Sequence, residues 1–214
     1  MFKPRISAPL ILSLLFSAAL LAGPARADTA EKGLETAIFA GGCFWCVESD
    51  FDKVPGVVKT ISGFSGGVTP NPTYKQVVTE STGHREVVQI TFDPKKVTYA
   101  HLVDVLFHSV DPTDGGGQFC DRGHSYSTAI YATTPEQKKT AEAVKKKLQD
   151  SGVLKKPIVT PIEDAGPFFP AEEYHQDFYT KSPVRYKFYR FNCGRNARVQ
   201  ALWGENAHKG IAKH

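Results

Sequence analysis

The chain has 214 residues, of which 41% are hydrophobic and 22% charged, and this composition suits one globular domain with a sizeable core. The formal net charge is +4, but residues 1–27 contribute three basic and no acidic side chains, so the remainder is almost neutral. No basic stripe indicates nucleic-acid binding, and no internal repeat or low-complexity linker divides the chain.

The first predicted element is a secretory signal peptide over residues 1–27. Lys3 and Arg5 form its basic start, an apolar segment covers 10–22, and Ala25-Arg26-Ala27 is a cleavage site. We expect cleavage before Asp28 and export to the periplasm or secretion. After cleavage nothing holds the chain in a membrane, and we expect residues 28–214 to form a single domain. The alternative is an uncleaved N-terminal anchor.

Strands and helices are predicted to alternate along the mature chain. Strands are predicted over 35–40, 57–65, 86–92, 127–132 and 157–164, and helices over 43–53, 98–109, 135–150, 170–179 and 195–204. The segments 68–83 and 111–125 are rich in Gly and polar residues and predict loops. This order predicts a two-layer α/β (α+β) sandwich, in which a mixed sheet with a ferredoxin-like core is flanked by helices.

Cys43 lies where the first predicted strand gives way to the first predicted helix. A thiol at a helix N-terminus meets the positive end of the helix dipole, which favours the nucleophilic thiolate. Phe44 and Trp45 follow it and predict a hydrophobic wall beside the thiol. The segment therefore indicates a reactive cysteine.

Cys46 lies three residues after Cys43, on the same face of the predicted helix. This C-x-x-C spacing permits a redox pair, half of a zinc site, or two packed thiols. Zinc is disfavoured, because Cys120 and Cys193 stand alone in the sequence, so we predict no metal. Export to an oxidising compartment leaves a further alternative, in which all four cysteines form structural disulfides.

Glu86 begins a strand whose alternation places it on one face with Val88, Ile90 and Phe92. That face is apolar and must point to the core. Desolvation raises the pKa of a carboxyl group, so Glu86 is a candidate acid near neutral pH. The alternative is a solvent-exposed glutamate at a strand end.

The predicted loop before the fourth strand concentrates polar side chains after a run of glycines, as binding loops often do. Asp121 can supply a charge and Tyr126 a hydroxyl group. The alternatives are an ordinary turn aspartate and a tyrosine at the start of a strand.

Several motifs, taken together, resemble the peptide methionine sulfoxide reductase A family. They occur in the family's order over about residues 36–203, and the first is the most specific. Phe64 stands where the family usually has tyrosine. The motifs are Gly42-Cys43-Phe44-Trp45-Cys46, Gly63-Phe64-Ser65-Gly66-Gly67, Asn71-Pro72-Thr73-Tyr74, Thr82-Gly83-His84-Arg85-Glu86, Asp111-Pro112-Thr113, Asp121-Arg122-Gly123 with Tyr126, and Ala171-Glu172-Glu173-Tyr174-His175-Gln176.

The resemblance implies a reaction in which the Cys43 thiolate attacks the sulfur of a methionine S-sulfoxide. Glu86 would protonate the sulfoxide oxygen, and the hydroxyl groups of Tyr74 and Tyr126 would hold it. Methionine would leave, and Cys43 would become a sulfenic acid. No metal or organic cofactor is implied.

Three further residues are implied to form the substrate pocket. Phe44 and Trp45 would surround the ε-methyl group of the substrate, and Asp121 would hold its backbone or order the site. The implied substrates are free methionine sulfoxide and oxidised proteins, whose repair would be the protein's role. The single-domain plan makes a monomer the default expectation.

A second cysteine is implied to condense with the sulfenic acid, and a thioredoxin-like reductant would then reset the enzyme. Cys46 replaces the glycine that many family members carry after the tryptophan. Cys193 resembles the C-terminal resolving position, and Cys120, beside Asp121, is a candidate relay. We favour Cys193 slightly, with Cys46 nearly level.

Two other functions fit part of the sequence. A thioredoxin-type oxidoreductase would explain C-x-x-C, and Thr160-Pro161 would be its cis-proline loop, but it leaves Glu86 and Asp121 unexplained. A secreted, disulfide-stapled binding protein would have all four cysteines paired and no fast-reacting thiol.

Overall fold

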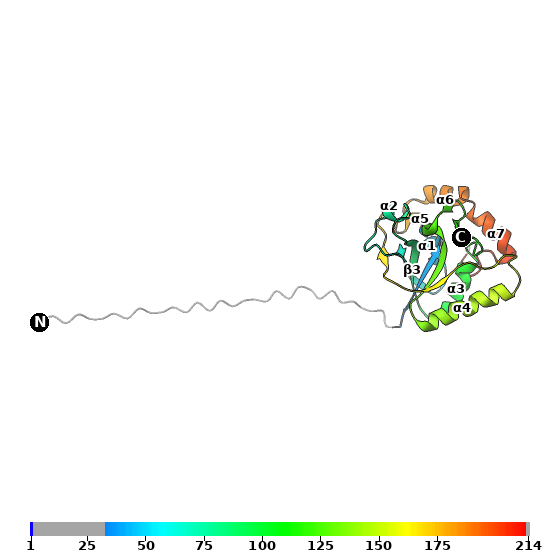
Figure 1. The fold of residues 1–214 in the computed structure, drawn as a ribbon, viewed down its shortest axis with the longest axis horizontal. Coiled ribbons are helices and arrows are strands. Elements are labelled where there is room, and N and C mark those ends of the chain that lie inside the picture. Colours follow the sequence, from blue (N-terminus) through cyan, green and yellow to red (C-terminus); the bar gives the residue numbers. More distant parts are fainter. Residues whose placement is uncertain (2–32, 213–214) are drawn as a thin grey trace. The chain divides into compact units, whose positions relative to one another are not determined.

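The computed structural model describes Met1 and residues 33–212, so the predicted signal peptide lies outside the described residues. The chain divides into Met1–Lys32 and Gly33–His214, and the elements that the structure describes belong to the second unit (Figure 1). No helix of that described part is long and apolar enough to span a membrane. The elements are β1 (Glu35–Gly41), α1 (Phe44–Phe51), β2 (Val57–Ser65), α2 (Tyr74–Val77), β3 (Arg85–Phe92), α3 (Tyr99–Phe107), β4 (Gly117–Gln118), β5 (Asp121–Arg122), η1 (His124–Tyr126), β6 (Thr128–Ala132), α4 (Pro135–Asp150), β7 (Ile162–Asp164), β8 (Phe169–Pro170), α5 (Phe178–Lys181), α6 (Pro183–Asn192), α7 (Arg195–Trp203) and η2 (Gly204–Asn206).

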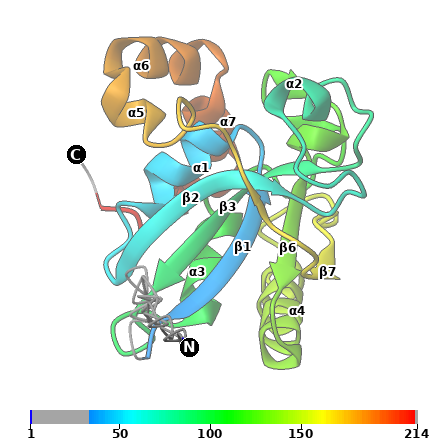
Figure 2. The ribbon, with the colours of Figure 1, turned by 90° about the vertical axis from the view of Figure 1, so that its left-hand side faces the viewer.

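The central sheet has six strands in the order β7-β6-β1-β3-β2-β8 (Figure 2). Neighbouring strands are antiparallel except β6 and β7, which pair in parallel across the α4 crossover. The four strands β6-β1-β3-β2 have the order and direction of a ferredoxin-like βαββαβ unit. The predicted mixed sheet and its ferredoxin-like core are therefore confirmed.

The two faces of this sheet bury different sets of side chains, because successive strand residues point to opposite sides. One face packs against the helices α1 and α3, and burial of each large side chain there contributes roughly 1.5–3 kcal/mol. The members of this main core on β1, β3 and β6 are Ala37, Phe39, Val88, Ile90, Phe92 and Ile130. The other face packs against Ala165 and Phe168 through Ile38, Ala40, Val87, Ala129 and Tyr131.

Two predicted loops contain short elements that the sequence analysis missed. Within 68–83, Thr73 begins α2 with a capping box, in which its side chain accepts a hydrogen bond from the N–H of Gln76. Within 111–125, β4 and β5 form a small hairpin of their own. The strand predicted over 157–164 is shorter, since only Ile162–Asp164 pairs with β6. By contrast, α4 begins at Pro135 and ends at Asp150, as predicted.

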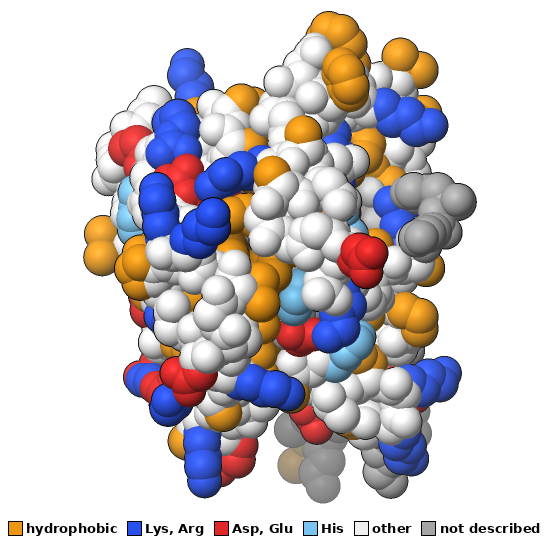
Figure 3. Space-filling view, turned by 90° about the vertical axis from the view of Figure 1, so that its right-hand side faces the viewer, with side chains coloured by type: hydrophobic (Ala, Val, Ile, Leu, Met, Phe, Trp, Pro, Cys, Tyr) orange, Lys and Arg blue, Asp and Glu red, His pale blue; other side chains and the backbone are white. Residues whose placement is uncertain are grey.

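The prediction of a helix over 170–179 is wrong. That segment holds the end of the edge strand β8, then turns, and then the start of α5. The helix that follows, α6, was missed because its apolar residues lie on two faces. Tyr186 is buried, whereas Val184, Phe188 and Phe191 are more than two-thirds exposed. Figure 3 shows hydrophobic side chains at the top of the molecule, the end at which Figure 1 places α6.

Candidate functional site

Cys43 caps the N-terminus of α1, immediately after β1. Gly42 makes the turn between them with a φ of +82°, and a β-carbon there would lie 2.6 Å from Cβ of Gln118. The carbonyl oxygen of Cys43 accepts the N–H of Cys46 at 3.0 Å. Both cysteines are buried and reduced. The predicted position of Cys43, at the turn from a strand to a helix, is therefore confirmed.

Glu86 lies beside this helix terminus. Its register partner on β2 is Phe64, and its Oε2 accepts the N–H of Phe44 at 2.8 Å. Only 2% of the residue is exposed. Burial raises the pKa of Glu86 well above its ordinary value, with the charges of Asp121 and Cys46 adding to the rise. The desolvated carboxyl predicted from strand alternation is therefore confirmed, and the exposed alternative is wrong.

Two tyrosine hydroxyl groups from different segments meet at the same site. Tyr74 begins α2 and Tyr126 ends η1, and each phenol is among the groups that shift the pKa of the other. Burial raises the pKa of both phenols, and the charge of Glu86 adds to the rise in each. Both groups are therefore neutral hydrogen-bond donors at physiological pH.

The two aromatic residues after Cys43 face an aromatic cluster. Phe44 is buried, and its ring centroid lies 5.8 Å from that of Phe64. Trp45 stacks on Phe178 at 3.8 Å and meets Tyr189 edge-on at 5.7 Å. The predicted hydrophobic wall beside the thiol is therefore present.

His175 fixes the indole of Trp45, a contact that the sequence analysis did not predict. Nε1 of Trp45 donates a hydrogen bond to Nδ1 of His175 at 3.0 Å. Burial lowers the pKa of His175, so the ring is neutral at pH 7, with Nδ1 as acceptor and the proton on Nε2. Its position in the motif Tyr174-His175-Gln176 was the one available sequence signal.

Asp121 lies on β5, and its Oδ2 accepts a hydrogen bond from the hydroxyl of Tyr189 on α6. Burial raises the pKa of Asp121. The Tyr189 hydroxyl also lies 3.9 Å from Sγ of Cys193, and its ring packs against the cluster that contains Cys43. Tyr189 thus connects Asp121 with the reactive thiol, and the sequence analysis missed it together with α6.

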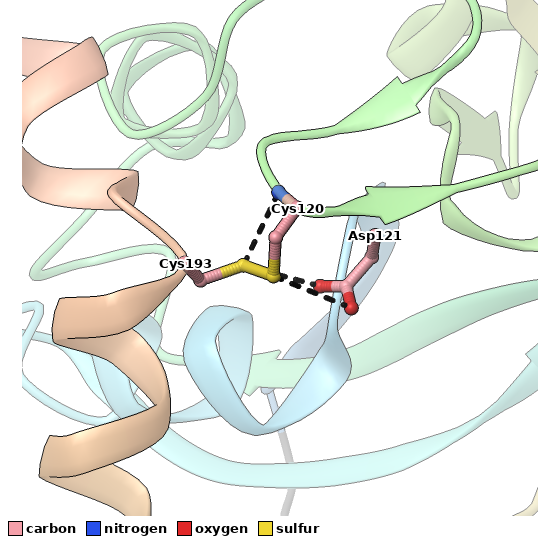
Figure 4. Close-up of side chains that lie close together, drawn as sticks. All are labelled: Cys120, Asp121 and Cys193. Carbon is pink, nitrogen blue, oxygen red and sulfur yellow. Dashed lines mark hydrogen bonds between the residues drawn. A yellow bond between two sulfur atoms is a disulfide. The ribbon is translucent and has the colours of Figure 1, made fainter.

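The four cysteines form one disulfide and one reduced pair. Cys120 and Cys193 are joined by a disulfide, which links the β4–β5 hairpin to the junction of α6 and α7 (Figure 4). Together with Asp121 they are the described side chains that cluster at metal-ligand distances, but both sulfurs are already bonded to each other. The alternative in which all four cysteines are paired is wrong, because Cys43 and Cys46 are thiols.

The pKa values of the two thiols in the reduced pair shift in opposite directions. Burial raises the pKa of Cys43 well above its ordinary value, and Cys46 and Glu86 raise it further. A hydrogen bond from Cys43, with the charges of Arg195 and Arg190, lowers the pKa of Cys46 to about 7. The thiolate expected at Cys43 therefore stays a prediction.

A separate cavity of about 640 Å³ lies among α6, α7, the end of α1 and residues 207–212. Its lining includes Asp50, Arg190 and His208, but not Cys43. No described peptide bond is cis, so the expected cis-proline at Thr160-Pro161 is wrong, and with it one argument for a thioredoxin-type protein.

The family model described as peptide methionine sulfoxide reductase matches residues 35–207. Peptide methionine sulfoxide reductase MsrA 2 of Rhizobium meliloti is 55% identical over 189 residues, covering 88% of this chain and 91% of that protein. Peptide methionine sulfoxide reductase MsrA of Bacillus subtilis is 52% identical over 170 residues, covering 79% and 96%.

Two solved structures have a similar fold. Methionine sulfoxide reductase A of Corynebacterium diphtheriae superposes with a TM-score of 0.65 at 36% identity, covering 72% of this chain and 78% of that one. The reduced form of Mxr1 from Saccharomyces cerevisiae superposes with a TM-score of 0.64 at 30% identity, covering 71% and 87%.

Proposed function

The chain belongs to the peptide methionine sulfoxide reductase family, and on that premise we propose that it reduces methionine S-sulfoxide, free and in proteins, to methionine. One observation carries the assignment of roles. The buried carboxyl of Glu86 accepts the N–H of Phe44, the residue directly after Cys43, so an acid and a nucleophile share one helix terminus.

In the first step the sulfur of Cys43 attacks the sulfoxide sulfur. Glu86, protonated because burial raises its pKa, gives its proton to the sulfoxide oxygen as negative charge develops there. The neutral hydroxyl groups of Tyr74 and Tyr126 hold the same oxygen. The oxygen moves to Cys43, which becomes a sulfenic acid, the proton lost by the Cys43 thiol returns to Glu86, and the two-electron reduction releases methionine.

The aromatic wall supplies the substrate site in this proposal. Phe44 and Trp45 surround the methyl group of the substrate, and the indole is fixed by its stacking on Phe178 and its hydrogen bond to His175. Asp121, held by Tyr189, faces the same site and binds the substrate backbone.

A second cysteine condenses with the sulfenic acid, and a thioredoxin-like dithiol reduces the resulting disulfide. This sequence of steps requires no metal or organic cofactor. The signal peptide predicted over residues 1–27 supports a reaction in the periplasm or outside the cell, and there the proposed role is repair of oxidised exported proteins. The mass of the protein recovered from the periplasm tests this, because cleavage before Asp28 fixes the expected N-terminus.

The test of function is turnover of a methionine S-sulfoxide peptide with dithiothreitol as reductant. We expect Cys43→Ser to abolish turnover, whereas Cys120→Ser, which opens the disulfide, retains it. Methionine production by Cys43→Ser would contradict the assignment of the nucleophile. A wild-type protein that consumes no sulfoxide even in a first turnover would contradict the function itself.

A further inference from the structure

The outer side of α6 carries apolar side chains that no described segment covers. Val184, Phe188 and Phe191 are 82%, 70% and 83% exposed. Their spacing of i, i+4 and i+7 places them in line along one side of the helix, and together they form the outer stripe of α6. A contiguous apolar surface with a polar rim marks a site at which a protein binds a partner.

The segment that carries the outer stripe is strongly basic. Residues 178–203 contain no acidic side chain, although residues 28–214 as a whole are almost neutral. Arg185 and Lys187 have no ion pair in the described part of the chain, and at about 100° per residue they flank the stripe on its two sides. A partner that covers the stripe is therefore expected to carry apolar and acidic groups. The other basic side chains of the segment pair with carboxylates and are Lys181, Arg190, Arg195 and Arg198.

The apolar surface continues from the outer stripe into the separate cavity of about 640 Å³. Phe191 and Lys187 line this cavity, and residues 207–212 contribute to its lining as well. The carboxylate in the lining, Asp50, is paired with Arg190 at 2.8 Å, so the charge of Lys187 remains available to an incoming acidic group. A cavity of this size is in the usual range for a bound ligand or a few side chains.

The inner side of the same helix belongs to the site around Cys43. Tyr189 hydrogen-bonds to Asp121 and meets Trp45 edge-on. Tyr189 and Phe188 are consecutive, so their side chains leave the helix about 100° apart. On a helix about 10 Å in diameter, the surface path between them is about 10 Å, which an extended chain covers in about three residues. A polypeptide bound at Cys43 can therefore reach the outer stripe with residues close to the reacting one.

We propose that the outer stripe and the adjoining cavity form a second docking surface for protein substrates, which binds a segment with apolar and acidic side chains about three to six residues from the oxidised methionine. This inference rests on the proposed function and adds to it a preference among protein substrates. The stripe supplies apolar contact, whereas Arg185 and Lys187 attract the acidic side chains. Free methionine sulfoxide occupies the Cys43 site alone and does not use this surface.

A protein substrate fits this surface better than two other partners do. A planar anionic membrane contacts the convex outer stripe but not the recessed cavity beside it. A folded protein reductant exposes few contiguous apolar side chains, whereas an unfolded, oxidised protein exposes its apolar segments. The substrate is also the partner whose own chain must enter the site at Cys43, one helix width away.

The first experiment compares KM for three substrates, with dithiothreitol as reductant. They are free methionine sulfoxide, a peptide with leucine and glutamate three to six residues on either side of the sulfoxide, and the same peptide with lysine in place of glutamate. The acidic peptide should have the lower KM of the two. Combining Phe188→Ser with Phe191→Ser should raise KM for the acidic peptide by about tenfold and leave kcat and the KM for free sulfoxide unchanged. The control is Val153→Ser, at a residue that is 53% exposed and far from α6 in the sequence.

Charge reversal tests the basic flank of the outer stripe. Lys187→Glu should raise KM for the acidic peptide roughly two- to fivefold and lower it for the basic peptide, as expected for an exposed charge pair. Because salt screens such pairs, the difference should shrink at high ionic strength. The matched control is Lys147→Glu on α4, which is exposed and lies at the opposite end of the domain from α6 (Figures 1 and 2).

The second experiment measures binding without turnover. In Cys43→Ser, the fluorescence anisotropy of the labelled acidic peptide gives its Kd. Adding Phe188→Ser and Phe191→Ser should raise this Kd by about tenfold, whereas adding Val153→Ser should not change it.

The outcomes separate this proposal from the proposed function. An unchanged ratio of the KM for the acidic peptide to the KM for free sulfoxide in the stripe variant overturns the docking surface. So does a defect seen only when a thioredoxin-like protein replaces dithiothreitol, which assigns the stripe to the reductant. Cosedimentation with phosphatidylglycerol vesicles that is lost in the stripe variant, with KM unchanged, assigns it to a membrane instead. A wild-type protein that reduces none of the three substrates contradicts the proposed function itself.

Discussion

At the scale of single residues, burial in the fold raises the pKa of the Glu86 carboxyl group, so that it can act as a general acid. Strand alternation predicts that Glu86 is desolvated, and that part of the site is readable from the sequence. The hydrogen bond from the N–H of Phe44 is not, because it depends on how α1 packs across β3. The same holds for His175 and Tyr189, whose partners lie far away in the sequence.

Glu86→Gln tests the acid directly. Because the glutamine cannot give up a proton, we expect the first turnover to slow by more than tenfold. In the wild type the rate should fall as pH rises through the raised pKa of Glu86, since the acid must be protonated, and this alkaline decline should disappear in the variant. The control is Glu142→Gln on the exposed side of α4, which should retain both rate and pH profile.

His175→Phe tests the fixing of the indole. The variant keeps an aromatic ring against Phe44 and Trp45 but removes the acceptor for Nε1 of Trp45. A loosened indole binds the substrate methyl group less well, so we expect KM to rise roughly 2- to 10-fold, in line with the loss of one hydrogen bond. An unchanged KM in steady-state assays would show that stacking on Phe178 alone positions Trp45.

At the scale of elements, α1 contributes to the reaction at its N-terminus and to the stability of the fold in its second turn. Glu48 lies in the second turn, where Oε2 accepts the N–H of Asp177 at 3.1 Å. Burial raises the pKa of Glu48 to about 7, and the nearby Asp52 and Asp177 contribute to the rise. This acidic contact holds the segment between His175 and α5 against α1.

Glu48 gives the fold a pH dependence whose sign follows from its raised pKa. Between the ordinary value of 4.5 and about 7, the folded state keeps a proton that the unfolded state has released. The free energy of unfolding should therefore be greatest at low pH and fall as pH rises through 7, by on the order of 3 kcal/mol at most. Denaturant titrations at several pH values should show that Glu48→Gln flattens this decline.

Elements with a regular apolar period and a local start signal were predictable, whereas α6 was not. The strand β2 and the helix α4 have the predicted bounds, because their periodicity and the Thr134-Pro135 start are local signals. The helix α6 has apolar residues toward both the core and solvent, which hides its period, although the proline at its first turn marked its start.

At the scale of the whole molecule, the disulfide between Cys120 and Cys193 connects segments that are 73 residues apart. It fixes the hairpin that carries Asp121 to the junction that carries Arg195. No spacing rule in the sequence selects this pairing among the alternatives for four cysteines. The mixed sheet with its ferredoxin-like core was easier to predict, because the order of strands and helices along the chain restricts it.

Cys120→Ser should lower the free energy of unfolding by about 4 kcal/mol, the stabilisation expected for a cross-link across a loop of this length. Denaturant titration of the oxidised variant measures it, with fully reduced wild type as the matched comparison. A variant as stable as the oxidised wild type would mean that the two segments stay together without the bond.

Because one cysteine pair is a disulfide and the other is reduced, the number of free thiols per molecule should report whether that molecule has turned over once. When a resting molecule is unfolded in the presence of a thiol reagent, it should react with two equivalents of the reagent, at Cys43 and Cys46. One equivalent of sulfoxide without reductant should reduce that titre to zero, whereas a sulfenic acid left unresolved would leave a titre of one. A stoichiometric titration of this kind distinguishes the two chemical endpoints in a single sample, with no need for spectroscopy of the intermediate.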